Sequence, residues 1–296
     1  GRALSMSRNN IKIGVILQGA ETPFMKEVLK GIQEACAEVD NLGGTVLVHK
    51  IEHQNAEDVI LAMEKMRMEE VSGIAMVPLD EERVKREIDR FVEEFRIPVV
   101  TFTSDVEDTK RLCFVGQNGV QCGRAAAGLM GELIGGKGKV AVISGYSTNT
   151  SLSSRVVGFR EEIARKYPGI EIIGPEYCFE ENGRAREITE GIFKDVPDLD
   201  GIYLTSHGGE GVCEAIAGAG KAGRVKMVAN DFMGRNYELM RKGFIHFLIG
   251  QDARIQGYEP VMILFRLLFN GEAPERAKIF TEIYIRNEYT IPEGRH

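Results

Sequence analysis

The sequence lacks three features that would assign it to a class at once: paired cysteines, long hydrophobic runs and clustered positive charge. Its five cysteines are an odd number, and no two of them have CxxC or metal-ligand spacing. No apolar run reaches the length of a transmembrane helix, and no signal peptide is recognisable. We therefore expect free thiols in a reducing compartment, and hence a cytoplasmic protein with no metal, no cofactor and no membrane partner.

The charge balance and the missing motifs argue against nucleic-acid binding, dinucleotide binding and enzyme activity. The net charge is -7 at pH 7 and the pI is near 5.5, so the composition does not favour nucleic-acid binding by this part of a protein. The segment GAGKAG (218–223) has the glycine spacing of a dinucleotide site, but it follows a helix and precedes a strand, the reverse of the required order. No nucleophile elbow is present, and we expect no enzyme activity.

What the sequence does contain is a regular alternation of short apolar runs and amphipathic segments. The runs are rich in valine and isoleucine, and each is followed by a helical pattern, which predicts an α/β fold with parallel strands covered on both faces. They cover residues 11–17, 45–51, 73–79, 98–103, 139–144, 170–174, 201–206, 225–231 and 244–251.

The number of these runs exceeds what a single open sheet of a small domain usually contains. The segment 111–130 breaks the rhythm with a short extra strand, and the strand pattern then restarts at residue 139. We expect two doubly wound lobes around a ligand cleft, one from residues 11–116 plus 252–273 and the other from 117–251 plus 274–291. Residues 1–10 are then the remnant of a linker.

Polar residues collect where the expected strands end. Segments such as QGAETPF, TFTSDVED, SGYSTNTSLSSR, NDFMGR and GQDAR follow the strands. Ligands of open parallel sheets bind at this edge, and a hydroxyl-rich ligand needs such donors and acceptors beside apolar ring faces. Loops at strand ends are polar in any case, so a purely structural role also stays open.

Four pieces of the sequence resemble the type I periplasmic-binding-protein fold, which occurs in ribose-type sugar-binding proteins and in lactose-repressor-type (LacI/GalR) regulators. ETPFMKEVLKGIQEA resembles the first helix of that family, where an aromatic residue, here Phe24, touches the sugar. SRVVGF resembles the segment whose arginine binds hydroxyls, here Arg155. NDF places the strand-end aspartate at Asp231, and IGQDARIQGYEPV places the cleft glutamine at Gln251.

The resemblance implies a set of ligand-binding residues. To the four above it adds Thr103 and Asp105, and the strand-end positions add the weaker candidates Thr22, Phe102, Asn118, Tyr146, Thr205 and Phe232. Each main candidate has a plainer alternative: Arg155 as a solvated helix residue, Asp231 as a helix cap and Phe24 as core. Thr103-Ser104 and Thr205-Ser206 replace charged or amide residues of the family, which departs from ordinary ribose recognition.

The first residues, GRALSMSRNNIKIGV, resemble the hinge of the regulators, where a leucine, here Leu4, wedges into the DNA minor groove. We therefore expect the effector-binding and dimerisation domain of a transcriptional regulator, a repressor by preference, that senses a sugar-like small molecule. It would act as a homodimer and bind operator DNA through a helix-turn-helix head absent from this chain. The alternative is an extracytoplasmic solute-binding protein of a sugar ABC transporter, and an α/β enzyme is a third, weaker possibility.

Overall fold

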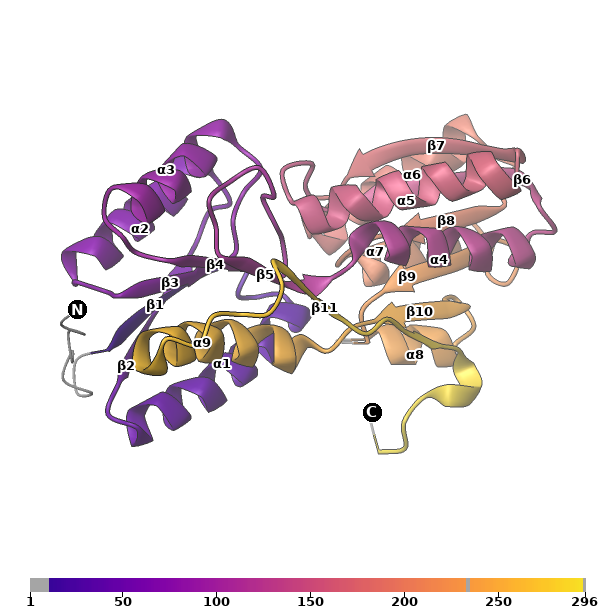
Figure 1. The fold of residues 1–296 in the computed structure, drawn as a ribbon. Helices are drawn as coiled ribbons and strands as arrows, with labels where there is room; N and C mark the ends of the chain where they lie inside the picture. Colours follow the sequence, from indigo (N-terminus) through magenta and orange to yellow (C-terminus); the bar gives the residue numbers. More distant parts are fainter. Residues whose placement is uncertain (1–10, 233–234, 295–296) are drawn as a thin grey trace. The chain divides into compact units, whose positions relative to one another are not determined.

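The computed structural model describes residues 11–232 and 235–294, and these form two α/β units (Figure 1). Unit 1 contains the described residues up to Gly116 together with Asp252–Thr281. Unit 2 contains Gln117–Gln251 and the described residues from Glu282 onward. Each unit is therefore assembled from segments far apart in the sequence.

Unit 1 is built on a six-stranded sheet with the order β11-β5-β4-β3-β1-β2. Strands β1 to β5 pair in parallel, and β3, β4 and β5 are buried along their whole length because helices cover both faces. The strands are β1 (Lys12–Gln18), β2 (Thr45–Ile51), β3 (Gly73–Met76), β4 (Val99–Phe102), β5 (Cys113–Gln117) and β11 (Lys278–Thr281).

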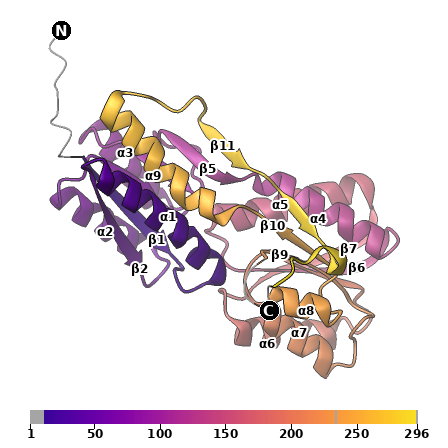
Figure 2. The same cartoon turned by 90° about the horizontal axis from the view of Figure 1, so that it is seen from below.

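The helices of unit 1 form two layers. Helices α1 (Pro23–Asn41) and α9 (Ala253–Asn270) lie side by side on one face of the sheet, and α2 (Ala56–Met68) and α3 (Glu82–Glu93) cover the other (Figures 1 and 2). Helix α1 begins where the sequence supplies a cap: the Thr22 side chain accepts the N–H of Met25, and Pro23 occupies the first turn.

Unit 2 repeats this plan with the strand order β12-β10-β9-β8-β6-β7. Strand β12 is antiparallel to β10, and the pairings among the other strands are parallel. The strands are β6 (Lys137–Ser144), β7 (Gly169–Tyr177), β8 (Gly201–Leu204), β9 (Lys226–Asn230), β10 (Phe247–Gly250) and β12 (Tyr284–Arg286).

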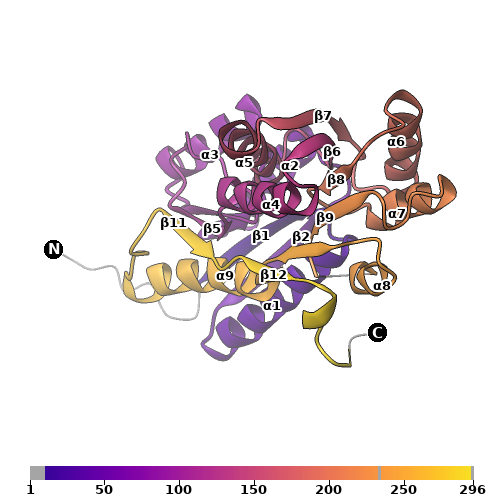
Figure 3. The same cartoon turned by 90° about the vertical axis from the view of Figure 1, so that its right-hand side faces the viewer.

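Helices cover both faces of this second sheet as well (Figure 3). Helices α4 (Gly119–Leu133) and α5 (Thr150–Lys166) bury one apolar cluster against it, and α6 (Asn182–Asp195), α7 (Gly209–Gly218) and α8 (Asn236–Arg241) bury another. The 3-10 turn η2 (Glu288–Thr290) follows β12.

A close crossing of two helices recurs in both units. Helices α1 and α9 meet at Gly31 and Gly257, and α4 and α5 meet at Gly123 and Gly158. At each of these glycines a Cβ would collide with a backbone carbonyl oxygen of the facing helix, so only glycine allows the approach.

The expected α/β architecture of two doubly wound sheets is confirmed, and every expected strand run overlaps an observed strand. Strands β11 and β12 were not expected, because they are short and mostly part-exposed and so carry no buried apolar pattern. The last segment of the second lobe was expected to begin at residue 274. Unit 1 instead keeps the chain to Thr281, since β11 adds to its sheet and the Phe114 N–H donates to Ala277 O at 2.9 Å.

Replacing Gly158 by alanine tests the α4–α5 crossing. Gly158→Ala would press a methyl group into the Val120 carbonyl, and we expect a loss of about 1–3 kcal/mol in the free energy of unfolding measured by urea titration. Gly128→Ala is the matched control on α4, because its Cβ would meet no atom within 4 Å. Helix propensity should make it neutral or stabilising by up to about 1 kcal/mol. Equal effects of the two substitutions would contradict the close crossing.

Candidate functional site

The centre of the candidate site is the buried guanidinium of Arg155, on α5 of unit 2. Its side chain reaches the carboxyl edge of the second sheet, where Nη1 donates to Thr205 O at 2.5 Å and Nη2 to Gln117 Oε1 at 3.0 Å. Arg155 is 2% exposed, and its Nε has no acceptor among the described residues. The alternative of a solvated helix residue is therefore wrong. A buried donor without an acceptor is costly unless a ligand supplies one.

Gln117 positions this arginine and was missed by the sequence reasoning. While its Oε1 accepts from Arg155, its Nε2 donates to Gly250 O at 3.2 Å, directly before Gln251. Gln117 is the last residue of β5, so the rule that sites form at the carboxyl ends of strands applies to it as well.

Asp231 and Gln251 lie together at the same edge. Gln251 Nε2 donates to Asp231 Oδ1 at 3.3 Å, and burial raises the pKa of the Asp231 carboxyl against the lowering effects of Arg155 and Gln251. Asp231 has a left-handed φ of 76°, which is uncommon for a residue other than glycine. Helix α8 begins further on, with Arg235 at its N-cap, so Asp231 does not cap it.

A second acidic residue, Glu180, joins this edge and was also missed. Its Oε2 accepts the backbone N–H of His207 at 3.1 Å. Burial raises the pKa of Glu180 to about 7, while Ser206 and the His207 N–H act to lower it. The strand expected over 170–174 ends before β7 does at Tyr177, so the sequence pattern did not place Glu180 at a strand end.

Beside Glu180 lies an aromatic pair, Tyr146 and Phe179. The ring centroids are 5.5 Å apart with the planes tilted by 53°, and Phe179 is 46% exposed. Tyr146 was expected at the site and Phe179 was not. An exposed aromatic face beside hydrogen-bonding groups suits a ligand with an apolar ring face.

Other candidates of unit 2 lie behind these groups. Thr205 is fully buried, and its hydroxyl is 2.7 Å from that of Ser144. Asn118 caps α4 by accepting the N–H of Gln121 at 3.1 Å. Phe232 is 8% exposed, and the guanidinium of Arg286 lies 4.2 Å from its ring centroid. These residues shape and support the edge.

The carboxyl edge of the sheet in unit 1 holds the other candidates. Thr22 caps α1, and Phe24 is part-buried in the first turn of that helix. Phe102 is 1% exposed and belongs to the core of its sheet. Thr103 has a left-handed φ of 60°, a strained conformation for a β-branched residue, and such strain is concentrated at functional sites.

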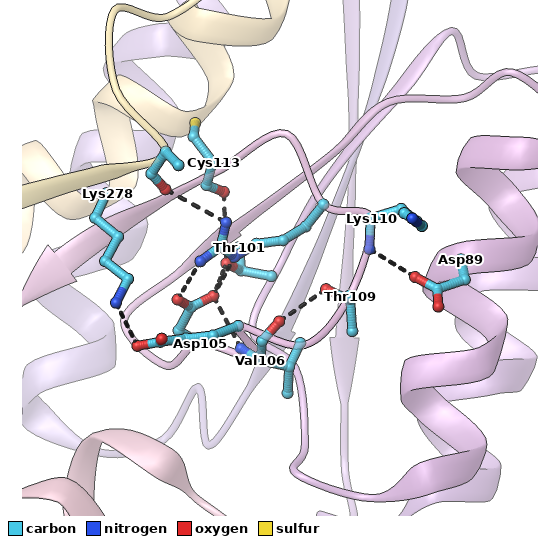
Figure 4. Close-up of polar contacts among 11 residues, drawn as sticks. Asp89, Thr101, Asp105, Val106, Thr109, Lys110, Cys113 and Lys278 are labelled. Atoms are coloured by element: carbon cyan, nitrogen blue, oxygen red, sulfur yellow. Dashed lines mark hydrogen bonds and ion pairs between the residues drawn. The ribbon is translucent and has the colours of Figure 1, made fainter.

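The carboxylate of Asp105 in unit 1 is held by hydrogen bonds from neighbouring residues of its own loop and sheet (Figure 4). Arg111 donates to both of its carboxylate oxygens, from Nε at 2.5 Å and from Nη2 at 2.6 Å. Thr101 Oγ1 and the N–H of Val106 also donate to Oδ1, each at 2.8 Å. The pair is buried, with the two side chains 5% and 11% exposed, so it fixes the loop that follows β4.

In the part of the chain that the structure describes, no group of three or more histidine, cysteine, aspartate or glutamate residues could hold a metal ion. No helix in residues 11–232 or 235–294 is long and apolar enough to cross a membrane. All five cysteines are free thiols, and four of them are buried. The residues of the candidate site offer hydrogen bonds, charge and aromatic surface to a ligand.

Two α/β units, each with polar and strained residues at the carboxyl edge of a parallel sheet, define the type I periplasmic-binding-protein fold. Residues 13–273 match the family described as the periplasmic binding protein domain, and the chain belongs to this family.

Relatives and solved structures agree with this assignment. The D-allose-binding periplasmic protein of Escherichia coli (strain K12) is 23% identical over 248 residues, 80% of this chain and 78% of that protein. The D-ribose/D-allose-binding protein of Pseudomonas aeruginosa is 25% identical over 230 residues, 74% of this chain and 70% of that protein. The glucose-galactose binding protein GanP of Geobacillus stearothermophilus has a TM-score of 0.88 at 23% identity, covering 96% of this chain and 99% of that one.

These matches overturn the expectation of a LacI/GalR-type regulator. The relatives are by name sugar-binding proteins, and the D-allose-binding one is named periplasmic, so the expected transcriptional function is wrong, and operator DNA and a homodimer lose their support. The cytoplasmic location is overturned on the same ground. Regulators and receptors share this fold, and the choice between them depended on the hinge-like residues around Leu4, which lie outside the described residues.

The Asp105–Arg111 ion pair can be tested through stability. Arg111→Met would leave a buried carboxylate without its cation, and we expect unit 1 to lose about 3 kcal/mol in urea unfolding. The double variant Asp105→Asn, Arg111→Met should recover most of this loss, because no buried charge remains. A single variant as stable as the unchanged protein would show that the pair has no structural role.

The raised pKa of Glu180 predicts a dependence of stability on pH. Its pKa lies near 7 in the folded protein against an ordinary value of 4.5, so the folded state binds the extra proton between these values. This contribution is fully present below the ordinary pKa and is lost as the pH rises through 7. We expect the protein to lose about 2 kcal/mol of stability from this group between pH 5 and pH 8.

The comparison is urea unfolding at both pH values for the unchanged protein, Glu180→Gln and the neighbouring exposed control Glu181→Gln. Glu180→Gln should remove this contribution, whereas the control should keep it. The same pH dependence in all three proteins would contradict the assignment.

Proposed function

We propose that the protein is the extracytoplasmic solute-binding component of a sugar ABC transporter, and that it binds a monosaccharide or a similar polyol without catalysis. The observation that carries this proposal is the buried Arg155, held by Gln117 and the Thr205 carbonyl beside the hydrogen-bonded Asp231 and Gln251. The relatives named for binding D-allose and D-ribose support the same ligand class.

The chemistry of the edge in unit 2 suits sugar hydroxyls. A hydroxyl both donates and accepts, so it can accept from the guanidinium of Arg155 while donating to the carboxylate of Asp231. Gln251 offers both roles through its amide, and Phe179 offers an apolar surface to the ring C–H groups. We propose Arg155, Asp231, Gln251 and Phe179 as direct ligand contacts.

In unit 1 we propose that Phe24 and Thr103 contact the ligand at the carboxyl edge of the first sheet. Asp105 then acts indirectly, because its carboxylate is occupied by Arg111 and holds the loop that carries Thr103. Thr103-Ser104 stand where ribose-type sites have a charged pair, and Asp105 follows one step further on and pairs with Arg111.

The partially pre-formed hydrogen bonds favour binding. Arg155 and Asp231 are already oriented by Gln117 and Gln251, so little side-chain entropy is lost when a ligand binds. Asn236 fixes the strained turn at Asp231 by donating to its carbonyl oxygen at 2.9 Å. A site oriented in this way discriminates between sugar epimers by the direction of single hydroxyl groups.

Thermal unfolding with and without sugars tests this function. D-allose, D-ribose, D-galactose and D-arabinose are the first ligands to examine, and one that is present at 100 times its Kd should stabilise the protein by about 2.7 kcal/mol. Arg155→Ala should abolish the shift, because the ligand loses its charged donor. Arg165→Ala, an exposed arginine on the same helix, is the control and should retain it.

Circular dichroism of each variant establishes that the fold is kept, and Arg155→Lys provides a smaller change if the alanine variant does not fold. An undiminished ligand shift in either folded Arg155 variant would contradict the assignment of this arginine. No shift with any sugar in the unchanged protein would contradict the proposed function.

A further inference from the structure

We propose that Glu180 makes this protein select an amino sugar, a sugar ring carrying an ammonium group, over the corresponding neutral sugar. This inference rests on the proposed sugar-binding function and names its ligand class. The relatives are named for neutral sugars, so the proposal concerns a feature of this chain's own residues.

The backbone of unit 2 is shaped to bring Glu180 to the site. Phe179 and Glu180 both have left-handed φ values, 55° and 62°, which two successive non-glycine residues rarely adopt. The turn places Glu180 Oε2 on the N–H of His207, after β8, and Oε1 against Gly145, after β6. A Cβ at Gly145 would collide with Oε1, so glycine at this position leaves room for the carboxyl group.

The site then holds two carboxyl groups and one permanent cation. The charge of Asp231 helps to raise the pKa of Glu180, and Arg155 acts to lower the pKa of both carboxyl groups. Among the described residues, neither carboxyl group has a lysine or arginine partner in an ion pair. Arg155 donates to the Thr205 carbonyl and to Gln117 rather than to either carboxylate.

The other titratable groups near Glu180 do not supply the missing charge. His207 follows β8, and burial lowers its pKa, so its imidazole is neutral at pH 7. Tyr146 and Cys178 contact the same region, and burial raises the pKa of both, which keeps them neutral as well. With Glu180 ionised, the charges of Arg155, Asp231 and Glu180 leave the edge one positive charge short.

A ligand ammonium group would complete this balance. Glu180 and Asp231 are each part-buried and so remain within reach of a ligand. Burial shifts Glu180 toward its protonated form, and an ammonium group placed beside it would favour the carboxylate through a charge-assisted hydrogen bond. Binding an amino sugar then releases a proton from Glu180, whereas binding a neutral sugar does not.

The experiment is isothermal titration calorimetry with matched pairs of probes: D-glucosamine with D-glucose, and D-galactosamine with D-galactose. Measurements at pH 5.5 and pH 7.0 span the ionisation of Glu180 while the sugar amine stays largely protonated. We expect at least one amino sugar to bind about tenfold or more tightly than its neutral partner at pH 7.0. Its affinity should fall at least about fivefold at pH 5.5, because Glu180 must then lose a proton on binding.

Glu180→Gln removes the charge and keeps the shape of the side chain. In this variant the ratio of amino-sugar to neutral-sugar affinity should fall to about one, and the pH dependence of the amino-sugar affinity should disappear. Glu181→Gln is the matched control, since it removes the same charge from the next, exposed residue. It should retain both the ratio and the pH dependence.

The outcomes separate this inference from the proposed function. Neutral sugars that bind as tightly as the amino sugars, or a preference that survives in Glu180→Gln, would overturn the inference and leave the sugar-binding function standing. No binding of any of these sugars, together with no shift in the melting panel above, would overturn both. A preference for the amino sugar that is lost in Glu180→Gln and retained in Glu181→Gln would establish the role of Glu180 in selecting amino sugars.

Discussion

The candidate site depends on one interaction, the burial of the Arg155 guanidinium at the carboxyl edge of the second sheet. A buried arginine requires acceptors, and here they come from Gln117 and from the backbone at Thr205. The close crossing of α4 and α5 makes this possible, because Gly123 lies against the carbonyl oxygen of Arg155 itself. The same glycines that pack the helices therefore place the charged group at the sheet edge.

Backbone strain marks both carboxyl edges. Thr103 in unit 1, and Phe179, Glu180 and Asp231 in unit 2, all adopt left-handed conformations that cost energy in residues other than glycine. Asn236 and the His207 N–H stabilise two of these turns through hydrogen bonds. A protein keeps such conformations where the direction of a side chain matters more than the stability of a loop, as it does in a binding site.

The family assignment shows that one fold can serve proteins of different function. The alternation of buried strands and amphipathic helices specifies two parallel sheets, and receptors and regulators built on this fold use that same pattern. The distinction between them depended on a few hinge-like residues, GRALS, and on free cysteines. Four of the five cysteines are buried, and a free thiol packs in a core like any small apolar side chain, so it says little about the compartment. A short motif and a cysteine count were therefore weak guides to what the protein does, and the relatives decided otherwise.

The sequence by itself determined the α/β class and the strands of both sheets apart from β11 and β12, and its resemblance to a known family suggested Arg155, Asp231 and Gln251 as candidate ligand contacts. The class and the strands follow from local periodicity, and the rule that parallel strands end at one edge shows where polar residues gather. Only the tertiary structure decided which neighbours share that edge. In the tertiary structure Asp105 pairs with Arg111, Gln117 accepts a hydrogen bond from Arg155, and the Glu180 carboxyl group packs against Gly145. Such contacts join residues distant along the chain, and no local pattern of sequence encodes them.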